Sequence, residues 1–191
     1  MATDAIALDL DVVGTDDGGS PVTADETTRL VRAAQSGATE AFGALYERFR
    51  PMVHGVLLAR VPRAEARDLA QDVFLAAYER LGALRDPAAF PGWLATIARN
   101  RALDWRRSTR ETVELPDDVA AEPGASEEGA RVMALLRELP EAYRETLVLR
   151  LVEGLTGPEI AARTGLTHGS VRVNLTRGMA LLRPLLPEAG R

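Results

Sequence analysis

Residues 156–182 read TGPEIAARTGLTHGSVRVNLTRGMALL, and the spacing within this stretch predicts two short helices joined by a tight turn. Thr156 and Glu159 have the spacing of a capping box at the start of the first helix. Gly165 stands where a left-handed residue can end that helix, and Thr167 is a suitable N-cap for the second. The pattern therefore indicates a helix-turn-helix motif.

The second helix of this motif is expected to carry a polar face. Val171 and Leu175 are expected to point inward, toward the first helix. The residues expected to point outward, together with the N-cap, are Thr167, His168, Ser170, Arg172, Asn174, Thr176 and Arg177. Because Arg and Asn side chains form paired hydrogen bonds with base edges in the major groove, this face predicts DNA binding. The alternative is an ordinary helical hairpin with a solvated face.

Charge is distributed unevenly around the net value of −5. Residues 1–28 carry seven acidic and no basic side chains, and residues 111–130 again carry seven acidic and no basic ones. In contrast, residues 29–110 carry fourteen arginines against eight acids, and residues 131–191 carry nine against six. Although the net charge is negative, residues 29–110 and 131–191 are each positively charged overall. Each of these two basic regions is suited to contact with nucleic acid.

The apolar residues recur with a helical period throughout both basic regions. Helices are predicted near residues 25–35, 39–59, 63–82, 87–107, 126–138, 141–153, 157–164 and 168–183. Pro51 is expected to kink or divide the second of them. The fold class predicted is all-α, with a four-helix N-terminal domain and a four-helix C-terminal domain that ends in the helix-turn-helix.

Composition also predicts how the chain is divided. Stretches rich in Gly, Pro, Ser and acidic residues indicate disordered or flexible segments before and between the domains. The predicted divisions are a disordered acidic tail (1–24), the N-terminal domain (25–110), a flexible acidic linker (111–128), the C-terminal domain (129–186) and a short tail (187–191).

Several classes of function are disfavoured by what the sequence lacks. It has no cysteine and only two histidines, which leaves no disulfide and no Cys-based zinc site. It has no glycine-rich phosphate loop with lysine and no cysteine nucleophile, so we expect no enzyme, no metal and no cofactor. No apolar run approaches the length of a membrane span, so we expect a cytoplasmic protein without membrane insertion.

Two segments of the N-terminal body stand out. Residues 68–75 (DLAQDVFL) place an acidic and amide stripe on one face of a predicted helix, for which a solvated face is the simpler reading. Residues 90–107 (FPGWLATIARNRALDWRR) combine an arginine cluster with two tryptophans. We interpret the tryptophans as core anchors. The arginines suit contact with phosphates and unpaired bases.

The order of these segments, followed by LPEAYRETLVL at 139–149 and the helix-turn-helix, resembles the ECF (extracytoplasmic-function) group of bacterial sigma factors. The resemblance implies a factor that binds core RNA polymerase and directs promoter-specific initiation of a stress- or signal-responsive regulon. Its implied partners are the β′ clamp helices and β subunit of the core, promoter DNA, and an anti-sigma factor of unknown type.

The resemblance also implies roles for individual residues. The core-binding residues would be Asp68, Gln71, Asp72 and Phe74. The residues on the minus-ten element would be Arg85, Trp93, Arg99, Asn100, Arg101, Asp104, Arg106 and Arg107, with residues 85–89 capturing a flipped base. The second helix of the helix-turn-helix would read the minus-thirty-five element.

One departure from the family pattern concerns this second helix. Residues 172–177 read RVNLTR, where family members commonly carry a run similar to Lys-Ser-Arg-Leu-x-Arg. The promoter sequence therefore does not follow from the resemblance. The alternative function is a free-standing helix-turn-helix regulator whose N-terminal body serves as a dimerisation or sensor domain.

Overall fold

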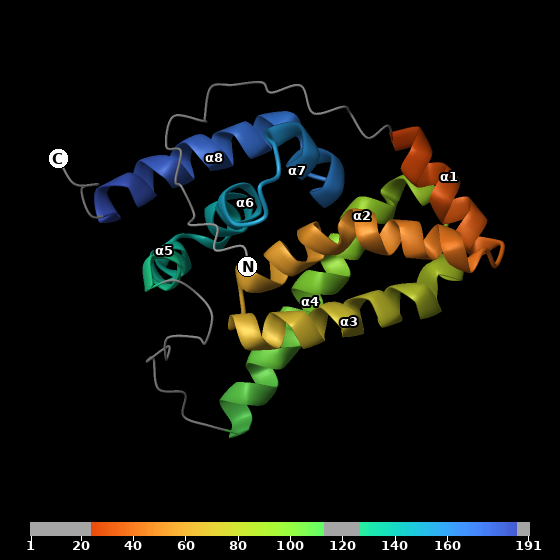
Figure 1. Ribbon diagram of the computed structural model, residues 1–191, viewed down its shortest axis with the longest axis horizontal. Helices are drawn as coiled ribbons and strands as arrows, with labels where there is room; N and C mark the ends of the chain where they lie inside the picture. Colours follow the sequence, from red (N-terminus) through yellow and green to blue (C-terminus); the bar gives the residue numbers. More distant parts are fainter. Residues whose placement is uncertain (1–23, 113–126, 187–191) are drawn as a thin grey trace, which may run out of the picture.

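The computed structural model describes residues 24–112 and 127–186, which form eight α-helices and no strand, as the all-α prediction requires (Figure 1). The helices are α1 (Ala24–Gln35), α2 (Thr39–Leu58), α3 (Arg63–Arg80), α4 (Phe90–Thr112), α5 (Glu127–Glu138), α6 (Glu141–Leu151), α7 (Gly157–Thr164) and α8 (His168–Leu182). Three short 3₁₀ turns are η2 (Leu81–Ala83), η3 (Pro87–Ala89) and η4 (Arg183–Leu185). The predicted tail, linker and C-terminal end fall, almost entirely, outside the described residues.

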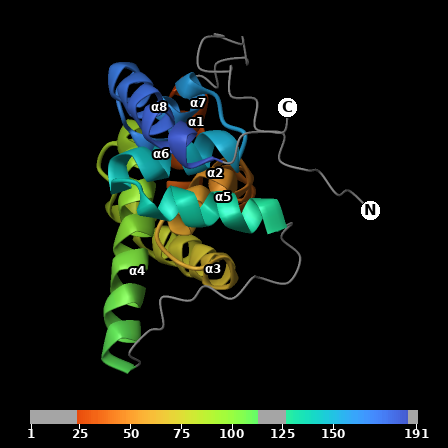
Figure 2. The same ribbon diagram turned by 90° about the vertical axis from the view of Figure 1, so that its left-hand side faces the viewer.

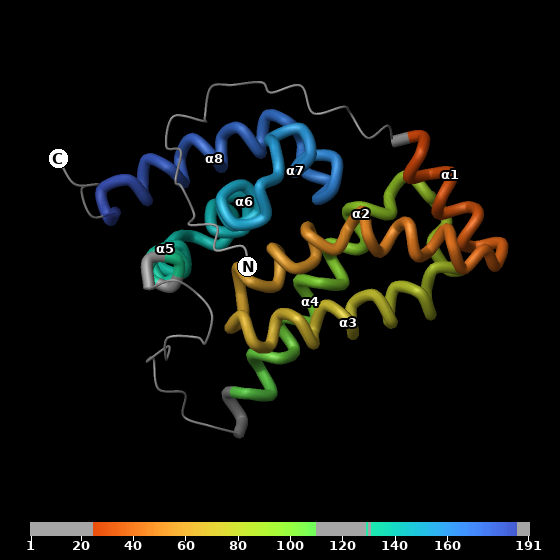
Figure 3. The backbone as a smooth tube through the Cα atoms, in the orientation of Figure 1, coloured from red at the N-terminus to blue at the C-terminus, as the bar shows by residue number. Residues whose placement is uncertain are grey.

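The N-terminal domain consists of α1 to α4. Helices α2 and α3 run side by side, and α4 crosses them, as the tube in Figure 3 traces. Their contact is filled by aliphatic and aromatic side chains, among which Phe49 of α2 and Phe90 of α4 meet edge to face at 5.3 Å. This crossing presents the arginine-rich half of α4 beyond the core.

The structure corrects two details predicted for this domain: the division of the second helix and the bounds of the fourth. Pro51 does not divide α2, which continues unbroken to Leu58, because Phe49, Met52 and Val53 are buried on both sides of the proline and hold the helix in place. The fourth helix starts later than predicted, because Asp86 accepts a hydrogen bond from the Ala88 amide (3.0 Å) and starts a separate 3₁₀ turn. It also ends later, at Thr112.

The C-terminal domain contains the predicted helix-turn-helix. Thr156 and Glu159 form the capping box: the Thr156 amide donates to the Glu159 carboxylate (2.9 Å), and the Glu159 amide donates to the Thr156 hydroxyl (3.4 Å). Gly165 takes the left-handed conformation (φ +75°), and Thr167 caps α8 by accepting from the Ser170 amide (3.1 Å). These local predictions are confirmed.

The two domains also pack against each other, which the sequence did not predict. Helix α6 contacts α2, and α7 contacts α4; Figure 2 shows the C-terminal helices lying against the N-terminal domain. The buried apolar residues of both domains form one continuous cluster. The close approach of the two domains depends on glycines. A Cβ at Gly55 would lie 2.6 Å from Leu149, and a Cβ at Gly165 would lie 3.0 Å from the backbone of Gly92.

The capping box yields a prediction about stability. Thr156→Ala removes the hydroxyl that accepts from the Glu159 amide, so we expect the free energy of unfolding to fall by about 1 kcal/mol. Thr156→Ser keeps the hydroxyl and should leave it nearly unchanged. Urea denaturation followed by circular dichroism measures both. Equal stability of the two variants would show that the capping box does not stabilise α7.

Candidate nucleic-acid interface

The outer face of α8 is open to solvent. His168, Arg172 and Arg177 are exposed, and neither arginine forms an ion pair with any residue that the structure describes. Thr167 and Ser170 are also exposed, with their hydroxyls 2.8 Å apart at the start of the helix. Since the first turn of α8 has no acidic residue, its amide groups and the arginines present a positive surface suited to phosphates.

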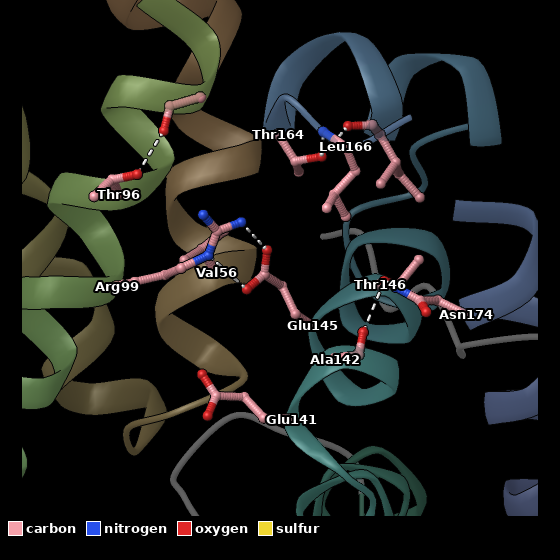
Figure 4. Close-up of polar contacts among 12 residues, drawn as sticks. Val56, Thr96, Arg99, Glu141, Ala142, Glu145, Thr146, Thr164, Leu166 and Asn174 are labelled. Atoms are coloured by element: carbon pink, nitrogen blue, oxygen red, sulfur yellow. Dashed lines mark hydrogen bonds and ion pairs between the residues drawn. The ribbon is translucent and has the colours of Figure 1, made fainter. Parts of the chain in front are cut away.

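Asn174 lies differently from its predicted neighbours on α8. It is half-buried, and its side-chain amide donates to the Thr146 hydroxyl of α6 at 3.4 Å, as Figure 4 shows. Thr146 in turn donates to the Ala142 carbonyl (2.9 Å). In this conformation the amide of Asn174 helps to seat α8 on α6, while Thr176 remains exposed.

The C-terminal half of α4 carries most of the predicted minus-ten residues on its surface. Asn100, Asp104, Arg106 and Arg107 are exposed, and Arg101 is half-buried. The Asp104–Arg107 ion pair is 3.9 Å long with both side chains more than half exposed, so it contributes little to stability and leaves the arginine available. The face has the chemistry needed to grip a phosphate backbone.

Arg99 points away from this face and toward the C-terminal domain. Its guanidinium donates two hydrogen bonds to the Glu145 carboxylate of α6, from Nη2 (2.7 Å) and Nε (3.1 Å), as drawn in Figure 4. Donating these hydrogen bonds to Glu145 raises the pKa of Arg99. Burial raises the pKa of Glu145, but the hydrogen bond from Arg99 and the charge of Arg60 outweigh it and hold that pKa below its ordinary value.

The tryptophans act as core anchors, as interpreted. Trp93 and Trp105 are half-buried and pack against the apolar cluster, and the Trp93 ring lies 5.9 Å from that of Phe90. Trp93 also lines a hollow between the start of α4 and α7, together with Leu84, Ala88, Thr96, Ala162 and Gly165. Ala88 belongs to the predicted base-capturing loop, so the loop and Trp93 border the same hollow.

That loop, which includes the exposed Arg85, is held by a residue the sequence analysis missed. The Gln35 side chain at the end of α1 donates to the Leu81 carbonyl (2.9 Å) and the Leu84 carbonyl (2.8 Å). No local pattern reveals this contact, because the partners are separated by more than forty residues. Gln35 is thus a positioning residue for the loop.

The acidic stripe on α3 is exposed at Asp68, Gln71 and Asp72. Phe74, predicted to contact polymerase, is only 4% exposed and packs on Tyr46 with ring centroids 4.6 Å apart, so it is a core residue in this structure. The exposed apolar member of the stripe is Leu75, at 58%. Its spacing of seven residues from Asp68 is the helical signal that could have found it.

Among the described residues, no cluster of His, Cys, Asp or Glu could hold a metal ion. None of the described helices combines the length and apolar character needed to span a bilayer.

Comparison with known proteins agrees with this arrangement. Residues 45–112 match Sigma-70 region 2, and residues 129–182 match Sigma-70, region 4. The chain belongs to the ECF group of RNA polymerase sigma factors. Region 2 covers most of the N-terminal domain and region 4 most of the C-terminal domain, so the free-standing regulator considered above is not favoured.

Individual relatives support the same assignment. The sigma factor is 35% identical to CarQ of Myxococcus xanthus over 81% of this chain and 94% of that protein. It is 33% identical to CnrH of Cupriavidus metallidurans, and the match covers 85% of this chain and 95% of that protein. Some curated relatives are longer, since the match spans 66% of the ECF sigma factor BldN of Streptomyces coelicolor and 41% of a relative from Xanthomonas campestris.

Solved structures show the same fold. The structure of CnrH in complex with the cytosolic domain of CnrY superposes with a TM-score of 0.60 at 29% identity, covering 87% of this sigma factor and 100% of that chain. RpoE from Bartonella quintana, solved with the anti-sigma factor NepR, gives a TM-score of 0.55 at 21% identity, covering 78% and 97%.

The contacts of Gln35 generate the second prediction. Gln35→Leu removes both hydrogen bonds to the loop carbonyls, so we expect amides in residues 81–89 to exchange hydrogen about tenfold faster, the equivalent of losing roughly 1.4 kcal/mol of local stability. Hydrogen exchange with mass spectrometry measures this. Amides of α8 serve as an internal control and should not change. Unaltered exchange in the loop would contradict the positioning role.

Proposed function

We propose that this sigma factor binds core RNA polymerase through α3 and places α4 on the minus-ten element and α8 on the minus-thirty-five element. The observation that best supports this is the exposure of three separate polar faces. One is acidic and lies on α3; the other two are rich in arginine and lie on α4 and α8. A protein that must contact a protein partner and DNA at two sites needs three such faces.

The α3 face suits a protein partner rather than DNA. Asp68 and Asp72 would repel phosphates, whereas Leu75 and Tyr78 (50% exposed) offer apolar area beside them. A mixed acidic and apolar strip of this kind fits a basic helical surface. The proposed partners are the β′ clamp helices, with further contact to the β subunit.

The proposed DNA contacts divide between the two domains. On α4, the exposed Asn100, Arg106 and Arg107 would hold the minus-ten strand, and residues 85–89 would capture a flipped base beside Trp93. On α8, Arg172 and Arg177 would enter the major groove. The role is non-catalytic: the factor positions the polymerase, which performs the chemistry.

An anti-sigma factor is the proposed regulator. CnrH was solved with the cytosolic domain of CnrY and RpoE with the anti-sigma factor NepR. By analogy, a partner of unidentified type would hold this factor inactive in the cytoplasm until a stress or other signal releases it. Run-off transcription by core polymerase on genomic fragments tests the function. DNA binding that needs no core, without co-purification of polymerase, would favour the free-standing regulator instead.

The α3 face gives a prediction about core binding. Asp72→Asn removes one charge from the proposed contact, so the Kd for core polymerase should rise at least about tenfold, or 1.4 kcal/mol. Fluorescence anisotropy of the labelled factor titrated with core measures this. Glu47→Gln, at an exposed acid on α2, is the matched control and should bind like the unaltered protein. Equal affinity of both variants would remove α3 from the interface.

The α8 face gives a prediction about promoter recognition. Arg172→Ala should weaken holoenzyme binding to a promoter found by run-off transcription by about 1–3 kcal/mol, and should relax preference at one base pair of the minus-thirty-five element. Arg131→Ala removes an exposed arginine from α5 and serves as the control. The readout is a gel shift with single-base promoter variants. Uniform weakening across all variants would indicate a phosphate contact instead of base reading.

A further inference from the structure

Two arginines of the N-terminal domain meet two acids of α6 where the domains touch: Arg60 and Arg99 bind Glu145, and Arg60 Nη2 also donates to the exposed Glu141 (2.6 Å). Glu145 of α6 accepts hydrogen bonds from Arg99 and, on Oε2, from Arg60 Nη2 at 2.6 Å. The side chains of Arg60 and Glu145 are only 8% and 7% exposed, so this carboxylate lies in a site built by the N-terminal domain. Arg60 is anchored there by donating to the Val56 carbonyl (2.8 Å).

Other contacts also join the two domains in this packed arrangement, which we call the closed form. His54 Nδ1 lies 2.7 Å from the Glu153 carboxylate, and Arg144 donates to the Ala59 carbonyl (3.2 Å). Gly55 leaves the space that Leu149 occupies. Matched charges and matched shape at several points distinguish this contact from a loose encounter of two surfaces.

The closed form occupies surfaces that the proposed function requires. Arg99 belongs to the predicted minus-ten set but is engaged with Glu145. Ala162 and Gly165 of the C-terminal domain form one wall of the hollow beside Trp93. A strand of DNA approaching this end of α4 would meet the helix-turn-helix.

We propose that Arg60 and Arg99 form a phosphate-binding site for promoter DNA, which Glu145 occupies in the closed protein and vacates when the domains separate. The inference rests on the proposed function. A guanidinium that holds a carboxylate with two parallel hydrogen bonds has the geometry to hold a phosphate in the same way. Arg60 thereby becomes a DNA contact that residues 90–107 alone do not reveal, and closure becomes self-inhibition.

Two substitutions should open the protein by different means. Glu145→Gln keeps the size of the side chain but leaves Arg99 without its countercharge, and Arg60 with Glu141 alone, in the interface between the domains, which penalises closure alone. Gly55→Leu places a side chain where Leu149 packs, again opposing closure while favouring helix α2. The matched controls are Glu138→Gln, at an exposed acid, and Gly43→Leu, on the same helix with nothing within 4 Å.

Opening is measured by energy transfer between dyes. Because the chain has no cysteine, Ala44→Cys and Ala180→Cys give unique labels on exposed positions of α2 and α8. We expect lower transfer efficiency in Glu145→Gln and Gly55→Leu, and the efficiency of the unaltered protein in both controls. Circular dichroism confirms that each variant is folded. Unchanged efficiency in both opening variants would overturn the proposal.

DNA binding is measured with a short fluorescein-labelled oligothymidylate. The opened variants should bind it about tenfold more tightly than the unaltered protein, a coupling of ordinary size for a conformational equilibrium. Adding Arg60→Gln to Glu145→Gln should lower the salt dependence of binding by about 0.7 in slope, the value for one phosphate contact on a single strand. Opening without tighter binding, or an unchanged slope, would overturn the proposal.

Failure of the proposed function would look different. If the chain did not act as a sigma factor, Glu145→Gln would show lower energy transfer and tighter DNA binding, yet would support no run-off transcription with core polymerase. If only the proposed masking of Arg60 and Arg99 by Glu145 were wrong, the unaltered protein would still support transcription. Energy transfer would then be unchanged in both Glu145→Gln and Gly55→Leu.

Discussion

Glu145 carries a buried negative charge at the point where helices of both domains converge, and this charge constrains how they can be arranged. A carboxylate removed from water is costly unless cations with good hydrogen-bond geometry surround it. Arg60 after α2 and Arg99 on α4 provide these cations, so α6 fits closely only where both guanidinium groups reach it. Any arrangement that buries Glu145 without the two arginines would leave an uncompensated buried charge and is therefore disfavoured.

Small residues complement this electrostatic constraint. The core is built mainly from Ala, Leu and Val, with a few Phe, Met and Ile side chains, and glycines let helices approach where side chains would separate them. Gly178 on α8 lies against Leu147 and Tyr143 of α6, where a Cβ would come within 2.9 Å of the Leu147 side chain. Gly55 plays the same part between the domains. Shape therefore sets how near the helices lie, and charge sets which surfaces face each other.

Under the proposed self-inhibition, the same contact also bears on regulation. Sigma factors related to this one were solved with protein partners bound, and in this chain the C-terminal domain itself lies on the end of α4. Self-contact and partner binding need not exclude each other, because the acidic face of α3 and the outer face of α8 stay exposed in the closed form. A partner could stabilise closure from outside without entering the Arg60–Arg99 site.

The sequence by itself determined whatever depends on neighbours along the chain. Helix positions, the capping box at Thr156, the left-handed turn at Gly165 and the polar face of α8 follow from spacing of three to seven residues, and all are present in the structure. The segment order was also enough to indicate the family. These features need no knowledge of the rest of the fold, because the hydrogen bonds and faces involved are local.

Only the tertiary structure decided which of these residues are available. In the folded protein Phe74 is buried whereas Leu75 is exposed, and α2 continues through Pro51. Asn174 binds Thr146, and Arg99 pairs with Glu145. Each outcome depends on partners far along the chain, whose packing and charge outweigh local preference. A helical period places a side chain on a face, but the element that packs against that face decides whether it meets solvent, DNA or the protein itself.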